Sequence, residues 1–302
     1  YKRQSVAEAS ALLASGDGAQ LLQSKRIFHA EDGEQGAVTV AIAETAHPLA
    51  ASKGELHLVG SGPGSLQLLT ADARTALSRC VLWVGYGLYL DLLEPLRRCD
   101  QVRLDGQLTR ERDRCWQALD LARQGARVAL ISSGDSGIYG MAGLALELWM
   151  DLPETERPRF QVHPGLSALQ LAAARAGAPL MHDFCTISLS DRLTPWDVIE
   201  RRIEAAASGD FVVAIYNPRS RDRNWQLTRA KEILLCARPE TTPVVMARQL
   251  GRSDEQVSLH SLGNLRPEDV DMLTVLVIGN SSSRVQDGRM VTPRGYPGAT
   301  LN

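Results

Sequence analysis

The chain has 302 residues, a length that fits roughly two domains, and 44% of them are hydrophobic, as in globular proteins that bury a core. Its 35 acidic and 33 basic residues give a formal net charge of -2, which argues against the basic surface of a general nucleic-acid binder. The longest apolar stretch, residues 81–90, contains Gly85 and Gly87 and is shorter than the roughly 18 residues of a membrane-spanning helix. The sequence therefore predicts neither nucleic-acid binding nor a membrane span.

The cysteines and histidines are scattered, so we expect no disulfide framework and no metal site. The chain begins without an initiator methionine and without the apolar core of a secretory signal. We therefore expect a cytoplasmic protein that is part of a longer chain. Only four of the 33 basic residues are lysine. The arginine excess has two alternative explanations. One is GC-rich codon usage, and the other is a substrate with several carboxylates, which guanidinium groups bind through paired hydrogen bonds.

Residues 1–54 differ in pattern from the rest of the chain. Ser5 and Glu8 have the spacing of a helix capping box, which predicts a helix as far as residue 14. Strands are predicted at 21–28 and 38–43, with a polar loop between them. One helix and two strands cannot build a core alone. We therefore interpret residues 1–46 as a short α+β remnant of another domain and 47–54 as a linker.

From residue 55 onward, strand and helix patterns alternate. The first set has predicted strands at 55–59, 81–84, 102–104, 127–131 and 160–162, and helices at 69–79, 86–96, 110–123, 140–149 and 166–176. The second set has strands at 184–189, 211–216, 244–248, 256–260 and 273–278, and helices at 196–207 and 223–237. Such alternation predicts an α/β fold with a mostly parallel sheet in the first set. Pro179 lies in the expected boundary, which gives domains at 55–180 and 181–284 and a surface tail at 285–302.

Several loops that follow predicted strands have an unusual composition, and ligands collect at the carboxyl ends of parallel strands. The first loop contains Gly60, Gly62, Pro63 and Gly64. It is similar to a dinucleotide-binding turn, but the third glycine comes one residue early and Pro63 has no N–H to offer a phosphate. This spacing disfavours NAD, and a tight structural turn is the alternative.

The second loop, residues 132–140, contains Gly134, Asp135 and Ser136. Gly-Asp-Ser-Gly also occurs around the nucleophile of trypsin-like proteases, but those are β-barrels and this loop joins a parallel strand to a helix. Helix amides beside a carboxylate suit a ligand that carries both a negative group and an amine or hydroxyl. A helix cap made by the aspartate or the serine is the alternative.

The third and fourth loops also carry hydroxyl groups. In the third, Pro164, Gly165 and Ser167 precede a helix. In the fourth, Thr194 and Pro195 have the form of a helix start, whereas the neighbouring residues 190–192, Ser-Asp-Arg, have no such structural explanation. Asn217 and the arginines at 219, 221 and 223 follow a later strand, and they form either a solvated helix start or a carboxylate clamp.

Together and in this order, the loops resemble those of the tetrapyrrole (corrin/porphyrin) methyltransferases, which use S-adenosylmethionine (SAM). The resemblance covers residues 55–284 and rests on the motifs Gly60-x-Gly62-Pro63-Gly64, Gly134-Asp135-Ser136, Pro164-Gly165-x-Ser167-Ala168 and the strand 274–279 with Asn280-Ser281. Segments 188–196 and 215–220 resemble the precorrin-3B C(17)-methyltransferase branch. Ser65 stands where many members have aspartate. Residues 1–46 resemble the C-terminal tail of a cobalt-precorrin-5A hydrolase-like domain.

The resemblance implies two α/β domains of the tetrapyrrole methylase type, with SAM bound in the cleft between them and the tetrapyrrole beside it. A homodimer is also implied, and no metal is required. The residues implied to bind the cofactor are Gly62, Pro63, Gly64, Gly134, Asp135, Ser136, Tyr139, Ser167, Ala168 and Asn217.

The activity that the resemblance implies is methylation of precorrin-3B at C17 with ring contraction to precorrin-4, in cobalamin biosynthesis. Contraction needs a base and a hydrogen-bond donor. The candidate base is Asp191, supported by Ser190 and Thr194, and the candidate donor is Tyr216. The arginines expected near the substrate carboxylates are Arg192, Arg219 and Arg221. The alternatives are a methyltransferase for another precorrin or for uroporphyrinogen, a nicotinamide oxidoreductase, and a non-catalytic interaction module of a fusion protein. Cobalt-containing and cobalt-free substrates both fit the sequence.

Overall fold

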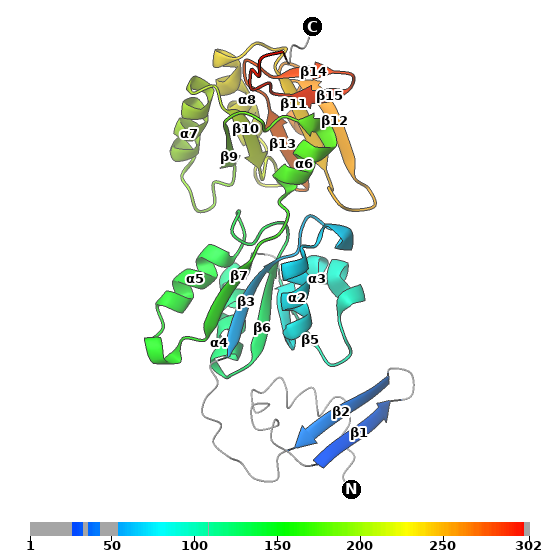
Figure 1. Ribbon diagram of the computed structural model, residues 1–302. Coiled ribbons are helices and arrows are strands. Elements are labelled where there is room, and N and C mark those ends of the chain that lie inside the picture. Colours follow the sequence, from blue (N-terminus) through cyan, green and yellow to red (C-terminus); the bar gives the residue numbers. More distant parts are fainter. Residues whose placement is uncertain (1–25, 33–35, 43–53, 108, 299–302) are drawn as a thin grey trace. The chain divides into compact units, whose positions relative to one another are not determined.

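The computed structural model describes residues 26–32, 36–42, 54–107 and 109–298 (Figure 1). The chain divides into two compact units between Leu166 and Ser167, here called unit 1 and unit 2. The helix predicted at 5–14 and most of the predicted linker lie outside the described residues. Among the described helices, none is long and apolar enough to cross a membrane.

A two-stranded hairpin precedes the α/β part of the chain. Strands β1 (Arg26–Asp32) and β2 (Gly36–Ile42) pair antiparallel, with Arg26 opposite Ile42. The strand predicted at 38–43 is confirmed. The first strand was predicted at 21–28, of which residues 21–25 lie outside the described residues, and it ends later than predicted, at Asp32.

Unit 1 contains a five-stranded sheet in the order β5-β4-β6-β3-β7, and all of its neighbouring strands pair in parallel. The strands are β3 (Glu55–Gly60), β4 (Leu82–Tyr86), β5 (Val102–Gly106), β6 (Arg127–Ser132) and β7 (Arg159–His163). The helices are α2 (Ala71–Arg79), α3 (Gly87–Leu93), α4 (Glu111–Arg123) and α5 (Ala142–Met150), with short 3-10 helices η2 (Leu66–Leu68), η3 (Glu94–Leu96) and η4 (Glu154–Glu156). The parallel sheet predicted for this part of the chain is confirmed.

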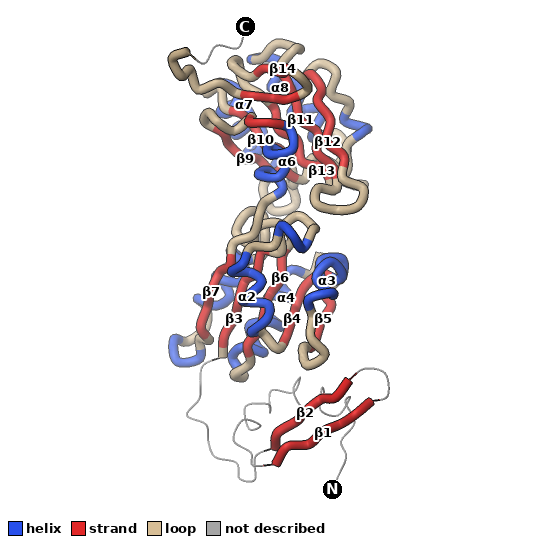
Figure 2. The backbone as a smooth tube through the Cα atoms, turned by 45° about the vertical axis from the view of Figure 1, so that its right-hand side comes forward, coloured by secondary structure: helices blue, strands red, loops and turns tan. Residues whose placement is uncertain are grey.

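Helices cover both faces of the unit 1 sheet, which lies between them in Figure 2. Leu56 and Leu58 of β3 pack in the core that contains α4 and α5, whereas Val59 packs in the core that contains α2. Because successive side chains of a strand point to opposite faces, β3 needs apolar residues in both directions. This arrangement explains its nearly continuous apolar sequence. His57 lies on the α2 face and is the polar exception.

Unit 2 contains a mixed sheet in the order β12-β11-β13-β10-β9, in which only β9 and β10 pair in parallel. The strands are β9 (Phe184–Ser188), β10 (Val212–Tyr216), β11 (Pro243–Arg248), β12 (Gln256–Ser261) and β13 (Thr274–Ile278), and the helices are α6 (Ala168–Ala176), α7 (Trp196–Ser208) and α8 (Gln226–Ala237), with a 3-10 helix η5 (Pro267–Asp269). Helices α7 and α8 pack on each other, while α6 contacts β11, β12 and β13. The helix predicted at 166–176 thus lies with unit 2, ahead of the expected boundary near Pro179.

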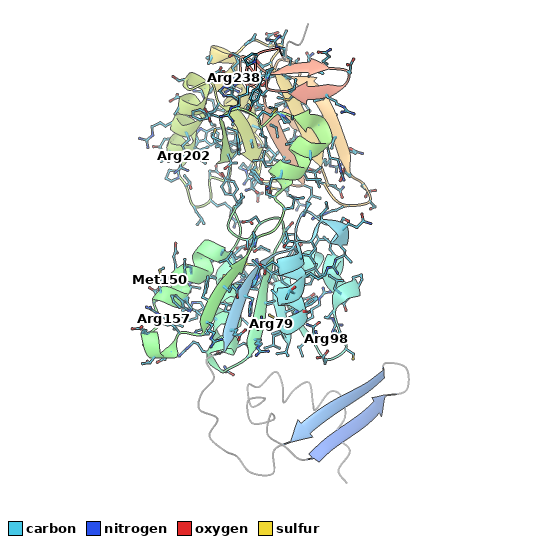
Figure 3. The ribbon with its side chains drawn as sticks, viewed as in Figure 1. Arg79, Arg98, Met150, Arg157, Arg202 and Arg238 are labelled. Atoms are coloured by element: carbon cyan, nitrogen blue, oxygen red, sulfur yellow. The ribbon has the colours of Figure 1, made fainter. Side chains whose placement is uncertain are left out.

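A buried arginine ties three elements of unit 2 together. Arg238, labelled in Figure 3, follows α8, and its guanidinium donates to the carbonyl oxygens of Gly279 at 2.5 Å and Phe211 at 2.6 Å. A longer bond of 3.3 Å reaches the carbonyl of Ala206. Burial lowers the pKa of Arg238, and Asp210 opposes this effect. These bonds satisfy carbonyl groups at the end of α7 and beside β10 and β13.

The last described segment closes unit 2. Strands β14 (Arg284–Gln286) and β15 (Arg289–Val291) form a hairpin, and β15 pairs in parallel with β8 (Gly177–Ala178). Met290 and Thr292 are fully buried. Residues 284–292 are therefore part of the fold, in contrast to the surface tail expected from residue 285.

Candidate active site

The turns after β3, β6 and β7 meet at one edge of the unit 1 sheet. These strands are neighbours and run in parallel, so their carboxyl ends lie side by side. Gly62 and Gly134 form an isolated antiparallel bridge, with N–O distances of 3.0 and 2.8 Å. The Gly60–Gly64 turn and the 132–140 loop, which are far apart in the sequence, therefore share a backbone-paired edge.

The third turn approaches the other two so closely that side chains do not fit. A Cβ atom on Gly165 would lie 2.0 Å from the carbonyl oxygen of Gly134 and 2.7 Å from that of Gly60. A Cβ atom on Gly60 would lie 2.6 Å from the amide nitrogen of Gly165. Only glycine allows this packing of backbone on backbone. We call the surface formed by turns 60–64, 134–136 and 164–165 the glycine edge.

Asp135 holds the second and third turns of the glycine edge together. Its Oδ1 accepts from the amide of Gly137 at 2.8 Å, and its Oδ2 accepts from the amide of Gly165 at 3.0 Å. The neighbouring Ser136 side chain is fully buried, with its Oγ 3.5 Å from the carbonyl of Leu58. Asp135 and Ser136 thus have structural roles as side chains.

Two other residues at this edge have notable local geometry. Tyr139 has a φ of 54° and is half exposed. A positive φ is uncommon for a bulky residue and occurs most often at functional positions. Ser65 accepts from the amide of Gln67 at 3.2 Å and caps η2. An aspartate can accept the same bond, so the serine at this position preserves the turn.

In unit 2, β9 and β10 run in parallel and bring the 188–191 and 216–217 segments to one edge. The amide of Leu189 donates to the carbonyl of Tyr216 at 3.0 Å. Asn217 has a left-handed backbone, with a φ of 49°, and its Nδ2 donates to the Oγ of Ser188 at 3.0 Å. The same Oγ accepts from the amide of Ser190 at 3.2 Å. The two segments are therefore locked to each other by hydrogen bonds.

Asp191 receives support from the start of α8. The Nε2 of Gln226 donates to Asp191 Oδ2 at 2.8 Å, and Gln226 is only 2% exposed. Gln226 is not among the residues predicted from the sequence. The available signal was a polar residue on the apolar face of a helix, in line with Ala230 and Ile233.

Arg223 is the second buried polar residue of this cluster. Its Nη2 donates to the carbonyl of Asn217 at 3.0 Å, which holds the left-handed turn. Burial lowers the pKa of Arg223, and the charge of Asp191 opposes this effect. The Nε of Arg223 is buried and has no hydrogen-bond partner within the described part of the chain. The buried Arg223 guanidinium is thus stabilised in its charged form by the opposite charge of Asp191.

Comparison with known proteins identifies the family. Residues 55–266 match the Tetrapyrrole (Corrin/Porphyrin) Methylases. The chain belongs to the tetrapyrrole methylase family. It is 47% identical over 245 residues to a probable cobalt-factor III C(17)-methyltransferase of Salmonella typhimurium, which covers 80% of this chain and 99% of the relative.

Two further relatives place the chain within the tetrapyrrole methylases. A precorrin-3B C(17)-methyltransferase of Sinorhizobium is 41% identical over 253 residues, or 82% of this chain and 99% of that protein. A crystal structure of the methyltransferase CobJ superposes with a TM-score of 0.76 and 37% identity, covering 80% of this chain and all of that one. The α/β fold of this chain is therefore the tetrapyrrole methylase fold.

The start of α6 explains two of the residues that the tetrapyrrole methylase motifs single out. Ser167 forms a capping box with Gln170 and is buried, and Ala168 is the first residue of the helix. The hydroxyl of Tyr216 accepts from the amide of Leu169 at 3.0 Å, in the first turn of α6. Tyr216 thereby links the end of β10 to a helix N-terminus, where amide groups are unsatisfied.

The remaining predicted residues of this tetrapyrrole methylase differ in exposure. Arg192 and Arg221 are exposed, and Thr194 is half-buried before α7. Arg219 donates to the carbonyl of Pro267 at 3.1 Å. Arg192 and Arg221 are thus the predicted arginines with exposed side chains, whereas Arg219 also has a structural bond.

Burial raises the pKa of three thiols of this family member. Burial raises the pKa of Cys80 and of Cys115 to about 12, so both stay protonated at neutral pH. Burial also raises the pKa of Cys185. Among the residues described here, no group of three or more His, Cys, Asp and Glu side chains is arranged to hold a metal ion.

Proposed function

We propose that this protein is a SAM-dependent methyltransferase that methylates C17 of precorrin-3B or cobalt-factor III in cobalamin biosynthesis. The convergence of Gly62, Gly134 and Gly165 in one glycine edge, in a chain of the tetrapyrrole methylase family, is the observation that carries this proposal. Relatives with this activity align over nearly their whole length. The second step that we propose is contraction of the ring to precorrin-4.

The glycine edge fits SAM by its chemistry. SAM carries an amino group, a carboxylate and ribose hydroxyls, which backbone N–H and C=O groups can bind without a charged side chain. In unit 1, the residues that would hold it are Gly62–Gly64, the backbone of 134–136 and Tyr139. In unit 2, Ser167, Ala168 and Asn217 would take part. The bound cofactor supplies a methyl group on a positively charged sulfur.

Asp191 is the base that we propose for ring contraction. Gln226 donates to one of its carboxylate oxygens at 2.8 Å, which fixes the orientation of the group. A base of this kind accepts a hydroxyl proton from the substrate. Tyr216 is the proposed hydrogen-bond donor, while Ser190 and Thr194 support the loop. Exposed Arg192 and Arg221, together with Arg219, would bind the substrate carboxylates.

Calorimetric titration with S-adenosylhomocysteine, run beside NADH, tests the cofactor assignment. We expect binding of one S-adenosylhomocysteine per chain and no binding of NADH. Folded protein that binds neither ligand would contradict the proposal and favour a non-catalytic interaction module.

Replacing Asp191 tests the chemical step. Asp191→Asn keeps the shape and the contact with Gln226, so we expect unchanged affinity for S-adenosylhomocysteine and turnover lowered by roughly 10²–10⁴-fold. Asp197→Asn is the matched control, because Asp197 is an exposed residue of α7 whose ion pair with Arg201 spans 3.6 Å. Equal turnover of the two variants would exclude Asp191 as the base.

We also infer a homodimer from the family resemblance. Analytical ultracentrifugation should give the mass of two chains, and a concentration-independent monomer would contradict the inference.

A further inference from the structure

A line of hydrogen-bonded titratable groups lies in unit 1 beside the glycine edge. Glu55 Oε2 is 3.0 Å from His57 Nε2, and His57 Nδ1 is 2.8 Å from His163 Nε2. His163 Nδ1 is in turn 2.7 Å from Asp72 Oδ2. Both imidazole rings are only 3% exposed, and their centroids stack 5.1 Å apart. The proposed reaction uses none of these four side chains.

The number of protons in this line follows from its geometry. Three consecutive hydrogen bonds need three protons, but two neutral imidazoles supply only one each. If both rings were neutral and donated to Asp72 and Glu55, two nitrogen lone pairs would face each other across 2.8 Å. The observed arrangement therefore holds one additional proton.

The surroundings identify the group that carries this proton. Burial would raise the pKa of Glu55, but the bond from His57 and the charge of Arg127 outweigh it and lower the pKa. Asp72 has more than half of its side chain in water. Burial lowers the pKa of His57, although its bond to Glu55 opposes the shift. The additional proton is therefore assigned to the His57–His163 pair.

Other charged groups near the line leave this assignment intact. Arg127 and Arg159 lie 3.6 and 3.9 Å from Glu55 Oε1 and favour the ionised carboxylate. Arg79, at the end of α2 and labelled in Figure 3, disfavours a second proton on His57. Cys80 stays a neutral thiol, because burial raises its pKa to about 12.

The protonated pair lies directly behind the third turn of the glycine edge. His163 precedes Pro164 and Gly165, and Thr70 Oγ1 donates to the carbonyl of Pro164 at 3.0 Å. Thr70 also caps α2, whose first turn contains Asp72. Residues 163 and 164 are thus both tied to the N-terminus of α2. We propose that His57 and His163 share one proton and act as positioning residues for the turn at Pro164 and Gly165.

The shared proton makes the stability of unit 1 depend on pH in both directions. In the unfolded chain each histidine has a pKa of about 6.5, so the two bind about two protons at low pH and none at high pH. The folded pair keeps one. Below about pH 6.5 the stability falls as pH falls. One ring of the folded pair is neutral and binds a proton when the chain unfolds, so low pH favours the unfolded state. Above about pH 6.5 the stability falls as pH rises, because the folded pair binds more protons than the two unfolded histidines do.

Urea unfolding between pH 7 and 8.5 tests the stability effect. We expect the unfolding constant of unit 1 to rise close to tenfold per pH unit in the unaltered protein, the limit for one linked proton. In His57→Leu only the smaller rise that the unfolded Cys80 and Cys115 thiols give to every variant should remain, because His163 can then be neutral and still donate to Asp72. His182→Leu is the matched control, since His182 has 46% of its side chain exposed in unit 2, and it should keep the rise. Equal slopes in all three proteins would overturn the proposal.

Nitrogen NMR of histidine-labelled, unaltered protein tests the same idea without a substitution. At pH 7.5 we expect one ring of the pair to be an imidazolium and the other neutral, whereas two neutral rings would overturn the proposal.

The effect on ligand affinity rests on the proposed function. S-adenosylhomocysteine should bind several-fold more weakly at pH 8.5 than at 6.5, and His57→Leu should lose this dependence. A pH-independent affinity would overturn the positioning role, and protein that shows the stability effect but never binds the ligand would refute the proposed function alone.

Discussion

Gly165→Ala tests the glycine edge most directly, because the added methyl group would clash with the backbone of the neighbouring turns. Its Cβ atom would lie 2.0 Å from the carbonyl oxygen of Gly134, whereas ordinary contacts begin at 3.4 Å. The turns would have to separate by more than an ångström, which also breaks the bond from the Gly165 amide to Asp135. Overpacking costs roughly 1–3 kcal/mol, and loss of a hydrogen bond to a charged group costs about 1.5–3 kcal/mol. We therefore expect unit 1 to lose about 3 kcal/mol.

Hydrogen exchange of peptides from β3 and β6 measures this change in unit 1 alone. A loss of about 3 kcal/mol corresponds to roughly 10²-fold faster exchange of the most protected amides, and binding of S-adenosylhomocysteine should weaken with it. Gly143→Ala is the matched control, because Gly143 lies in the first turn of α5 and a Cβ atom there meets nothing within 4 Å. The control should keep the protection of the unaltered protein. Unchanged protection in Gly165→Ala would refute the close approach of the turns.

Three further substitutions probe unit 2. Gln226→Leu removes the donor to Asp191, and we expect turnover to fall about tenfold with unchanged affinity for S-adenosylhomocysteine; equal turnover would exclude a positioning role. Tyr216→Phe removes the acceptor of the Leu169 amide and should destabilise unit 2 by about 1 kcal/mol in urea unfolding, so unchanged stability would contradict that bond. Arg238→Met leaves buried carbonyl groups without a donor and should cost about 3 kcal/mol or more, whereas a loss below 1 kcal/mol would show that water replaces the guanidinium.

The strand and helix pattern was predictable from sequence where burial makes the pattern strong. Strand β6 is a run of apolar residues buried on both faces, and it lies within one residue of its predicted bounds. Helix α6 was predicted to begin two residues early and to end where it does, but its assignment to unit 2 was not predicted. Periodicity shows that a helix has an apolar face, but it does not show which sheet that face covers.

The glycine edge was predictable in part, because turns after neighbouring parallel strands meet at one edge. The contacts of Asp135 and Ser136 were not predictable, since a polar residue in a loop can face a ligand or satisfy the backbone. Gln226 was missed for a related reason. Its partner Asp191 is far away in the sequence, and only the fold brings the two together.

The pairing of β15 with β8 sets an order of events during synthesis. Gly177 has a φ of 133°, and a Cβ atom there would lie 2.4 Å from the carbonyl oxygen of Met290, so the two segments fit tightly. The whole unit 1 sheet is complete once residue 163 has left the ribosome. In unit 2, by contrast, β8 follows directly after α6 but pairs with β15. This pair cannot form until residues 289–291 have been synthesised. A nascent chain that has emerged as far as residue 165 therefore contains every strand and turn of the glycine edge, whereas unit 2 still lacks β15.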